Sequence, residues 1–480
     1  MRSLFRGAFL RGVSCLALAG SLAACSTPNP QPLNRPGDVP PSFTAPSDKT
    51  APVWPKADWW SAFNAGELVG LEQTAQKENL DIAQAAAQVL QAEARDGVAL
   101  SALFPTLGAG FSANRSGGNS VPTRNAFSTS LTTSYQQGFF GTQYFQLQGA
   151  RENLRFQRYA AAVTGISVAQ EVANEYFLIL SLRERIAIAN ANIAAAKRIL
   201  AITQAKVNSG VSSNLELAEQ QAVLAQQEST LPNLIQAEKQ ARYTLAVLLG
   251  RAPEGFDIDA QNLDGIVTPS VQPGLPSELL LRNPQVAEAE ADLYAAHADV
   301  DYARSLYFPR LNLSGDAGFG PVGSLSNLFG ASGFGWSIGA SVLQSIFDGG
   351  NIHATNDLYR AQEQQLIAGY RKAVFTAFQD VEVALDTAKS TTDQLALIET
   401  ETRADAEAFR ISELQYREGT IDIVSLIQNQ QALFNAQQAL VITKLARLQA
   451  YLSLYTALGG GWEQKADDAA YKNQLDWWPL

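Results

Sequence analysis

Four short segments of the chain alternate apolar with small polar residues. In residues 311–319 the odd positions are Leu, Leu, Gly, Ala and Phe, and the even positions are Asn, Ser, Asp and Gly. In residues 334–342 the even positions are apolar and the odd positions are Gly or Ser, and residues 107–112 and 127–135 have the same period. A period of two predicts β-strands, here about 9–11 residues long, with one apolar face and one small polar face. The Gly-, Ser- and Asn-rich segments 115–126 and 320–332 are expected to be the loops between them.

The alternation fits two kinds of sheet. Strands of an outer-membrane barrel place apolar side chains toward lipid and polar ones toward the lumen, whereas a soluble antiparallel sheet places its apolar face under helices. Four strands do not close a barrel, because single-chain bacterial barrels start at eight, and an open sheet edge in lipid leaves backbone groups unsatisfied. The membrane interpretation therefore requires several chains: two give a filled barrel of eight strands, and three give twelve strands around a pore.

Most of the remaining sequence predicts helices, two of them very long. Residues 146–207 and 350–416 are rich in Ala, Gln, Glu and Leu and contain no proline. About 60 helical residues extend roughly 90 Å, so each such helix must lie along partners, and small residues on several faces indicate neighbours on both sides. Pro232 is expected to kink or interrupt its helix. Shorter helices are predicted over residues 64–102, 213–250, 277–305 and 423–458.

The same order of features occurs twice, about 204–209 residues apart. The matching pairs are Phe104-Pro105-Thr106-Leu107 with Phe308-Pro309-Arg310-Leu311, Ser134–Gly141 with Ser341–Asp348, Ser209-Gly210-Val211 with Glu418-Gly419-Thr420, and Leu245–Gly250 with Leu454–Gly459. This period is far too long for a solenoid and indicates duplication of a whole unit. The predicted organisation is a first repeat at 57–252, a linker at 253–276, a second repeat at 277–460 and a C-terminal tail at 461–480.

The N-terminus carries a targeting pattern. Residues 1–24 combine a basic start with an apolar middle, which predicts a secretory signal peptide. The sequence Leu22-Ala23-Ala24-Cys25 resembles a bacterial lipobox, which implies acylation of Cys25; the alternative is an ordinary signal peptide that contains a cysteine. Ser26, by the same resemblance, implies sorting to the outer membrane. Residues 25–56 are rich in proline and predict an extended, lipidated tether.

Composition narrows the function classes. The net charge of −11 argues against a nucleic-acid-binding protein, which normally has a basic patch. Two cysteines and two isolated histidines exclude disulfide scaffolds and zinc fingers, and they leave little material for nucleophile–base catalysis. Asp257-Ile258-Asp259 lies in the linker, and its two aspartates are interpreted as solvated residues of a turn rather than as ligands of a metal ion. No Gly-rich run is followed by Lys-Ser/Thr, which argues against a P-loop. No stretch of 18 apolar residues follows the N-terminus, which argues against a transmembrane helix. We expect no enzymatic activity, no cofactor and no metal.

Taken together, four features resemble the TolC-like outer-membrane factors. They are the lipobox, the duplicated helix–strand–strand–long helix–turn–helix unit, Phe-Pro-x-Leu before each strand pair, and Leu-Leu-Gly closing the first half. The resemblance covers about residues 57–460 and is strongest to the NodT-like lipoprotein branch of resistance–nodulation–division efflux systems. It implies a homotrimer in which a 12-stranded β-barrel in the outer membrane is continued by a long 12-helix α-barrel in the periplasm. It also implies a periplasmic adaptor protein and an inner-membrane efflux pump as partners.

The resemblance places the functional site where the long helices turn at Gly210 and Gly419. Tyr416 matches the family's aperture tyrosine, whereas Ser425 and Gln428 replace two aspartates that line the constriction in a well-known member. We expect Tyr416 to bond to a carboxylate at Glu216. A ring of carboxylates would favour cations, but each could equally serve a helix end, and closure could instead be apolar. The acidic candidates are Glu216, Glu219, Glu413, Glu418 and Asp422, and the apolar ones are Ile421, Ile423 and Leu426.

The predicted function is therefore the outer-membrane exit duct of a tripartite efflux system that passes small molecules from the periplasm to the outside. Two alternatives stay open. One is an outer channel for type I protein secretion, and the other is a structural coiled-coil lipoprotein of the periplasm. The alternating strands argue against the structural lipoprotein, which has no use for them.

Overall fold

The computed structural model describes residues 39–44, 54–138, 140–269 and 274–462. The signal peptide, Cys25, most of the tether and the tail from residue 463 lie outside the described residues. Two compact units can be distinguished, and each takes segments from both halves of the sequence. Among the described residues, the first unit comprises Gln88–Arg158 and Glu288–Lys372, and the second comprises the remaining segments.

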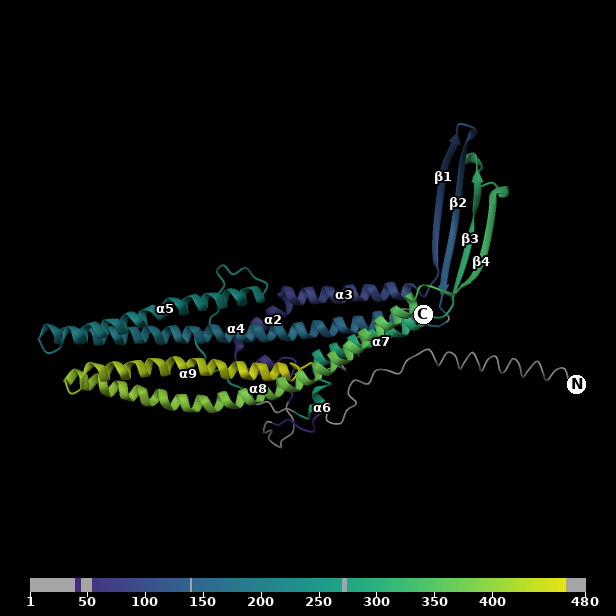
Figure 1. The fold of residues 1–480 in the computed structure, drawn as a ribbon. Helices are drawn as coiled ribbons and strands as arrows, with labels where there is room; N and C mark the ends of the chain where they lie inside the picture. The colour runs from purple at the N-terminus through teal and green to yellow at the C-terminus, as the bar shows by residue number, and fades with distance from the viewer. Residues whose placement is uncertain (1–38, 45–53, 139, 270–273, 463–480) are drawn as a thin grey trace. The chain divides into compact units, whose positions relative to one another are not determined.

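Apart from the short 3-10 helices, the order of helices and strands is the same in both halves (Figure 1). The first half contains η1 (Trp59–Phe63), α2 (Gly66–Glu78), α3 (Leu80–Ser101), β1 (Thr106–Gly118), β2 (Val121–Gln137), α4 (Thr142–Asn208) and α5 (Asn214–Leu248). The second half contains α6 (Pro276–Leu279), α7 (Pro284–Ser305), β3 (Arg310–Val322), η2 (Leu325–Asn327), η3 (Ala331–Gly333), β4 (Phe334–Leu343), α8 (Asn351–Glu418) and α9 (Ile423–Ala457). The two predicted long helices are confirmed: α4 has 67 residues and α8 has 68.

Buried asparagines break the first helix of each half, which the sequence predicted to be continuous. The Oδ1 atom of Asn79 accepts hydrogen bonds from the backbone N–H groups of Asp81 (2.8 Å) and Ile82 (3.0 Å), so it caps the start of α3. Asn283 lies 204 residues later and caps α7 in the same way, by accepting from Gln285 N–H at 2.9 Å. Each helix therefore becomes two, because the asparagine side chain replaces the backbone acceptor at the break.

In the first unit, the four strands form one antiparallel sheet in the order β1-β2-β3-β4. The register places apolar positions opposite one another, as in the pair Ala317 and Trp336, and small polar positions opposite one another on the other face. The two predicted faces are thus continuous across all four strands. The apolar face is exposed, with Trp336 at 69% and Ile338 at 82%, which contradicts a soluble sheet with this face packed beneath helices.

The first three strands are longer than predicted, and the expected loop 115–126 is wrong. β1, β2 and β3 have 13, 17 and 13 residues, and only β4, with 10, falls in the predicted range. The pairing of β1 with β2 continues past Ser112, which bonds to Ser128 Oγ at 2.7 Å, as far as Gly118 opposite Val121. Cross-strand hydroxyl pairs and backbone bonds keep the ladder intact where composition alone suggested a loop.

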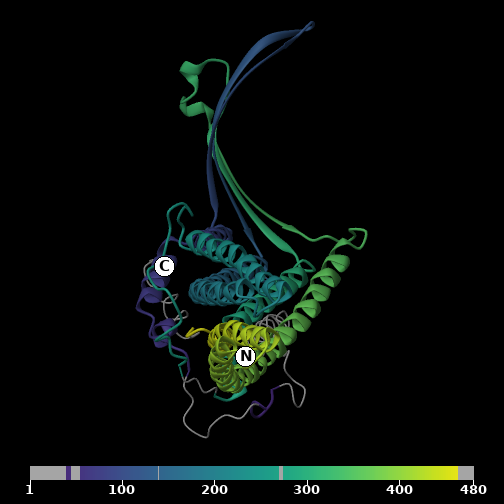
Figure 2. The same ribbon diagram turned by 90° about the vertical axis from the view of Figure 1, so that its left-hand side faces the viewer.

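In the second unit, η1 and α2 pack with the helices α4, α5 and α9 around an aromatic core. The ring of Trp59 stacks on that of Tyr455 with centroids 5.5 Å apart, and the buried Phe63 lies against Phe177 at 5.5 Å. The hairpin of α4 and α5 and the hairpin of α8 and α9 are visible as two long antiparallel pairs in Figure 1, and Figure 2 views them from the side of their turns.

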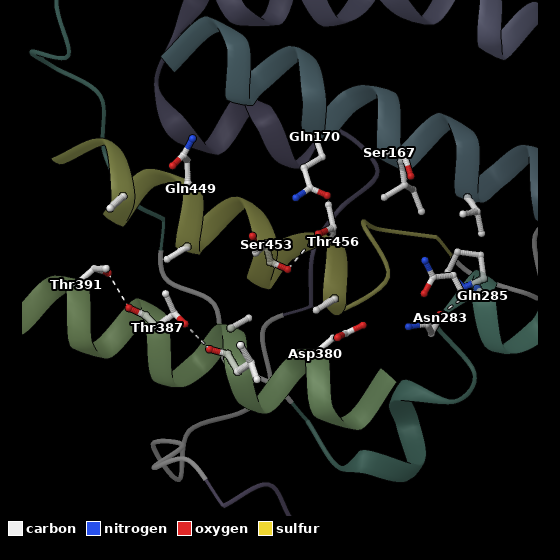
Figure 3. A pocket seen from close by; sticks show the side chains of 18 residues that line it. Ser167, Gln170, Asn283, Gln285, Asp380, Thr387, Thr391, Gln449, Ser453 and Thr456 are labelled. Atoms are coloured by element: carbon white, nitrogen blue, oxygen red, sulfur yellow. Dashed lines mark hydrogen bonds between the residues drawn. The ribbon is translucent and has the colours of Figure 1, made fainter. Parts of the chain in front are cut away.

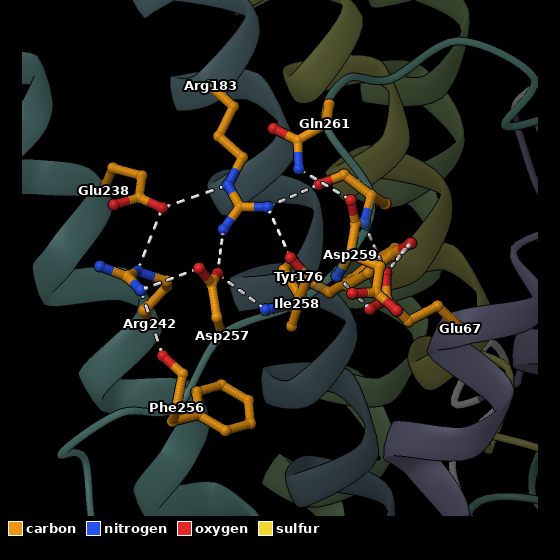
Figure 4. Close-up of polar contacts among 11 residues, drawn as sticks. Glu67, Tyr176, Arg183, Glu238, Arg242, Phe256, Asp257, Ile258, Asp259 and Gln261 are labelled. Atoms are coloured by element: carbon orange, nitrogen blue, oxygen red, sulfur yellow. Dashed lines mark hydrogen bonds and ion pairs between the residues drawn. The ribbon is translucent and has the colours of Figure 1, made fainter.

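A polar network fixes the linker between the two halves onto α4 and α5 (Figure 4). Arg183 donates to the carbonyl oxygens of Ile258 (2.8 Å) and Ala260 (2.7 Å) and forms an ion pair with Asp257. Glu238 on α5 accepts from the same guanidinium at 3.2 Å. Asp257 therefore serves as an ion-pair partner that holds the linker in place.

Helix α5 runs through Pro232, so the proline does not interrupt the helix, which was one of the two outcomes expected from the sequence. The proline removes one N–H donor, and the carbonyl that it leaves free belongs to Glu228, four residues earlier. Residues 228–230 and Pro232 itself are exposed, so water can satisfy this carbonyl. The exposed position accounts for the continuity of the helix.

Helix α4 contains an 18-residue stretch apolar enough to cross a membrane by length and composition alone, with a mean hydropathy of 1.3. Polar residues interrupt this stretch, so it is not a run of 18 consecutive apolar residues. The same helix supplies Phe177, Leu180 and Ile199 to the cores of the second unit. Its apolar character is thus accounted for by helix packing.

Glu72 is a fully buried acid on α2, one turn from the core residues Leu68 and Ala75. Neither of its carboxyl oxygens has a hydrogen-bond partner among the described residues. Burial raises the pKa of Glu72 to about 9, so the side chain is neutral at pH 7.

We predict that Glu72 makes the protein less stable as the pH rises. Its folded pKa is above the unfolded value of 4.5, so the associated stability is complete below pH 4.5 and is lost up to about pH 9. Between pH 5 and pH 7 the loss is roughly 2–3 kcal/mol of unfolding free energy. Glu72→Gln should match wild type at pH 5 and unfold at a higher temperature at pH 8, measured by circular dichroism in detergent. Glu78→Gln, at the exposed end of the same helix, is the control, and equal pH slopes for wild type and Glu72→Gln would contradict the prediction.

Candidate functional site at the hairpin tips

The two long hairpins of the second unit turn by the same construction. Gly210 after α4 has φ of 77°, and Gly419 after α8 has φ of 78°. In this left-handed conformation the next residue folds back, so that Val211 N–H donates to the carbonyl of Lys206 and Thr420 N–H to that of Gln415, both at 2.9 Å. Side chains with a Cβ rarely adopt this backbone conformation, which explains the repeated glycine.

Two predicted aperture carboxylates serve the helix starts just after these turns. Glu216 N–H donates to Ser213 Oγ at 3.3 Å, and Ser213 N–H donates to Glu216 Oε1 at 3.4 Å, which completes a capping box. Asp422 accepts from Ser425 N–H at 2.7 Å, and this hydrogen bond lowers the pKa of Asp422. Both contacts correspond to the helix-end role that the sequence left open.

Tyr416 connects the second hairpin to the first. Its side chain is buried, and its hydroxyl lies 3.1 Å from Thr203 Oγ1 on α4. The Lys206 ammonium group lies 4.1 Å from the centroid of the Tyr416 ring and donates to the backbone carbonyl of Tyr416. We call the contacts of Thr203, Lys206 and Tyr416 the tip joint.

Apolar packing and an ion pair continue the tip joint along both hairpins. Arg198 on α4 donates to Glu413 on α8 at 3.0 Å, so this acidic candidate is paired within the chain. A cluster of apolar side chains from α4, α8 and α9 surrounds Tyr416, and its buried members include Ile199, Phe409, Ile423, Leu426 and Phe434. The two hairpins are thus held side by side close to their turns.

The remaining predicted site residues lie around the same turns with varied exposure. Glu219 is half-buried on α5, Glu418 is the exposed last residue of α8, Ser425 is half-buried and Gln428 is exposed on α9. Within the chain, the structure does not join Tyr416 to Glu216, since each has the partner described above. Sequence reasoning missed Thr203, Lys206 and Arg198. The available signal was position, because Lys206 precedes Gly210 by four residues and Tyr416 precedes Gly419 by three.

A second candidate is a cavity of about 570 Å³ between α4, α8 and α9 in the second unit (Figure 3). Its walls carry amide and hydroxyl groups, such as those of Gln170, Thr387 and Ser453, and apolar side chains. Asp380 is the only ionisable residue that lines it, and burial raises the pKa of this carboxyl. The lining therefore holds no nucleophile–base pair for catalysis.

The two histidines are less isolated than the sequence suggested. In the first unit, His297 Nδ1 lies 2.7 Å from Glu363 Oε1, and His353 Nδ1 lies 2.9 Å from Asp357 Oδ2. In the part of the chain that the structure describes, no group of three His, Cys, Asp or Glu residues is placed to hold a metal ion. Each histidine thus has a carboxylate partner.

Comparison with known proteins relates the whole folded chain to one family. The family model described as outer membrane efflux protein matches residues 71–251 and 275–460. The pyoverdine export outer membrane protein OpmQ of Pseudomonas aeruginosa is 35% identical over 427 residues, which cover 86% of this chain and 90% of that protein. The cation efflux system protein CusC of Escherichia coli is 29% identical over 461 residues, covering 94% of this chain and 98% of that protein.

Solved structures show the same fold. The crystal structure of CusC superposes with a TM-score of 0.79 at 26% identity, covering 90% of this chain and 99% of that one. The open state of the Neisseria gonorrhoeae MtrE outer membrane channel gives a TM-score of 0.82 at 25% identity, with 91% and 99% covered. The match therefore includes both the sheet and the long hairpins.

Proposed function

Because this chain belongs to the outer membrane efflux protein family, we propose that it is the outer-membrane exit duct of a tripartite efflux system. It passes small molecules from the periplasm to the outside and works with a periplasmic adaptor protein and an inner-membrane pump that supplies the energy. Its relatives are named for pyoverdine export and for cation efflux. The structural observation that carries the proposal is the four-stranded sheet with an exposed apolar face.

This sheet explains why three copies are needed. Its apolar face suits lipid, but β1 and β4 are edge strands, and their backbone groups would remain unsatisfied in the bilayer. Three copies supply 12 strands, which close the edges and leave a pore lined by the small polar face. On that face, hydroxyl groups already bond across the strands, as between Thr106 and Ser134 at 2.7 Å. The resulting lumen is lined by small polar side chains, as a duct for water-soluble cargo requires.

The lipid-facing role of the sheet can be tested with one arginine on each face. Ile338→Arg on the apolar face should cost about 2–4 kcal/mol near the bilayer midplane and reduce the amount of heat-modifiable trimer in outer-membrane fractions. Ser337→Arg, at the adjacent position on the polar face, should assemble nearly as well as wild type, because its side chain points into the lumen. Equal assembly of the two variants would contradict the membrane-spanning sheet.

We further propose that the hairpin tips form the aperture of the duct, held closed by the tip joint of each copy. The hydroxyl bond from Tyr416 to Thr203 and the Lys206 contact hold the second hairpin against the first. Movement of the second hairpin away from the axis would therefore need to break these contacts in all three copies. The carboxylates Glu216, Glu219, Glu418 and Asp422 and the polar residues Ser425 and Gln428 lie around the turns, where they would meet the cargo.

Weakening the tip joint should open the duct. Tyr416→Phe removes a hydrogen bond that contributes about 1 kcal/mol per copy, and Lys206→Met removes the charge above the ring. The double variant should show higher single-channel conductance in planar bilayers and leak large antibiotics into cells. Glu216→Gln is the matched control, because Glu216 bonds only within its own hairpin turn and should change conductance little. Intact trimers with unchanged conductance in the double variant would place closure at another constriction.

We also propose that Cys25, which lies outside the described residues, carries a lipid anchor. The support is Leu22-Ala23-Ala24-Cys25 after an apolar run. Cells labelled with radioactive palmitate should incorporate label into the wild-type protein and none into Cys25→Ala. Part of the unlipidated protein should still reach the outer membrane, because the barrel itself inserts. Equal label in both proteins, or none in wild type, would refute the anchor.

A further inference from the structure

An exposed phenylalanine lies close to each edge strand of the sheet: Phe104 just before β1 and Phe347 shortly after β4. We propose that Phe347 of one copy stacks on Phe104 of the next copy, and that this pair sets the register in which β4 joins β1 between copies. The inference rests on the proposed trimeric barrel and adds to it the residues that form the contact. It derives from the internal duplication of the chain.

The chain contains a template for this contact at the joint between β2 and β3. Phe140 follows β2, Phe308 precedes β3, and their rings stack with centroids 4.2 Å apart and planes 18° apart. The β2–β3 ladder ends with Gln137 opposite Leu311. Counting three residues forward from Gln137 and three residues back from Leu311 places residue 140 opposite residue 308. The aromatic stack therefore continues the register of the ladder.

The repeated motifs transfer this joint to the edges of the sheet. Phe308 corresponds to Phe104 in the two Phe-Pro-x-Leu motifs, and Phe140 corresponds to Phe347 in the repeat of Ser134–Gly141 at Ser341–Asp348. Since Phe104 precedes β1 and Phe347 follows β4, their joint must form between two copies. Both rings are available for it, because Phe104 is 57% exposed and Phe347 is 90% exposed. Stacking them removes a large apolar area from water.

The implied register keeps both faces of the sheet continuous. With Phe347 opposite Phe104, the same register places Val342 opposite Ala109 and Ile338 opposite Ala113 of the next copy on the apolar face. It also places Ser337 opposite Asn114 on the small polar face. A slip by one residue would exchange the two faces, and a slip by two would preserve the faces but separate the phenylalanines.

Barrel closure favours this register over the one with a shift two residues larger, and the aromatic stack favours it over the one with a shift two residues smaller. In the observed ladders Leu107 lies opposite Thr133, Thr133 opposite Gly315, and Gly315 opposite Ile338. In the proposed register Ile338 lies opposite Ala113 of the next copy. The register therefore shifts by six residues per copy, from position 107 to position 113 of β1. Three copies then shift by 18 residues. At about 3.3 Å per residue and about 4.8 Å between strands, this corresponds to a strand tilt of about 46°, close to the usual 35–45°. A shift of eight residues gives about 54°, outside this range. A shift of four residues gives about 35°, so tilt does not exclude it, but it would separate the two phenylalanines.

Disulfide trapping tests the register in the full-length protein. Asn114→Cys with Ser337→Cys should give cross-linked dimers and trimers on oxidation, because directly opposite residues have the Cα separation that a disulfide needs. Within one chain β1 and β4 are three strand spacings apart, about 14 Å, so every bond must join two copies. Ser112→Cys and Ser116→Cys, each combined with Ser337→Cys, are the matched controls, and both should cross-link at least about tenfold less.

A dominant Ser112→Cys or Ser116→Cys product, or trimers in which none of the pairs cross-links, would overturn the inference while leaving the trimeric duct in place. Failure to form any trimer in the outer membrane would instead refute the proposed function.

The aromatic stack itself is tested by coupling. Phe104→Ala and Phe347→Ala should each lower the temperature at which detergent-extracted trimers dissociate, and the double variant should be no worse than the single ones, because one contact is lost only once. Ile346→Ala, at a neighbouring position that is 97% exposed, should leave that temperature unchanged. Additive losses from the two phenylalanine variants would show that the rings do not contact each other.

Discussion

The unsatisfied backbone of the sheet edges is the constraint on which the rest of the architecture depends. A sheet of four strands with an exposed apolar face is stable neither in water nor alone in lipid. In water the apolar face has no cover, and in the bilayer the N–H and C=O groups of β1 and β4 have no partner. Association of copies within the bilayer satisfies both conditions, because lipid covers the apolar face and neighbouring copies pair the edge strands. The oligomer is therefore a requirement of the fold.

Internal duplication solves this problem with one kind of joint. The β2–β3 contact inside the chain joins the two repeats, and a β4–β1 contact between copies repeats it around the ring. The same economy governs the helices, where Asn79 and Asn283 cap equivalent helices and Gly210 and Gly419 form equivalent turns. Because each of three chains contains two equivalent repeats with the same caps and turns, the trimer has approximate sixfold symmetry.

The two repeats differ where function requires a difference. At the tips, the second hairpin carries Tyr416, and the first carries Thr203 and Lys206, so the joint between them is asymmetric. The two capping carboxylates, Glu216 and Asp422, are occupied by helix starts instead of closing the aperture within the chain. In the proposed aperture, helix capping and closure therefore involve different residues, so the tip joint can break while the capped helix starts stay intact.

The sequence alone determined the features that depend on local backbone geometry. The period of two marked the strands, the proline-free runs marked α4 and α8, and the glycines marked both turns, since each involves only neighbouring residues. Tertiary structure decided the rest. Tyr416 met Thr203, 213 residues away, Pro232 was tolerated because its surroundings are exposed, and β1 and β2 extended through a loop-like sequence because each supplied the other with hydrogen bonds. Such pairings depend on which distant groups lie within bonding distance, and no local pattern specifies that.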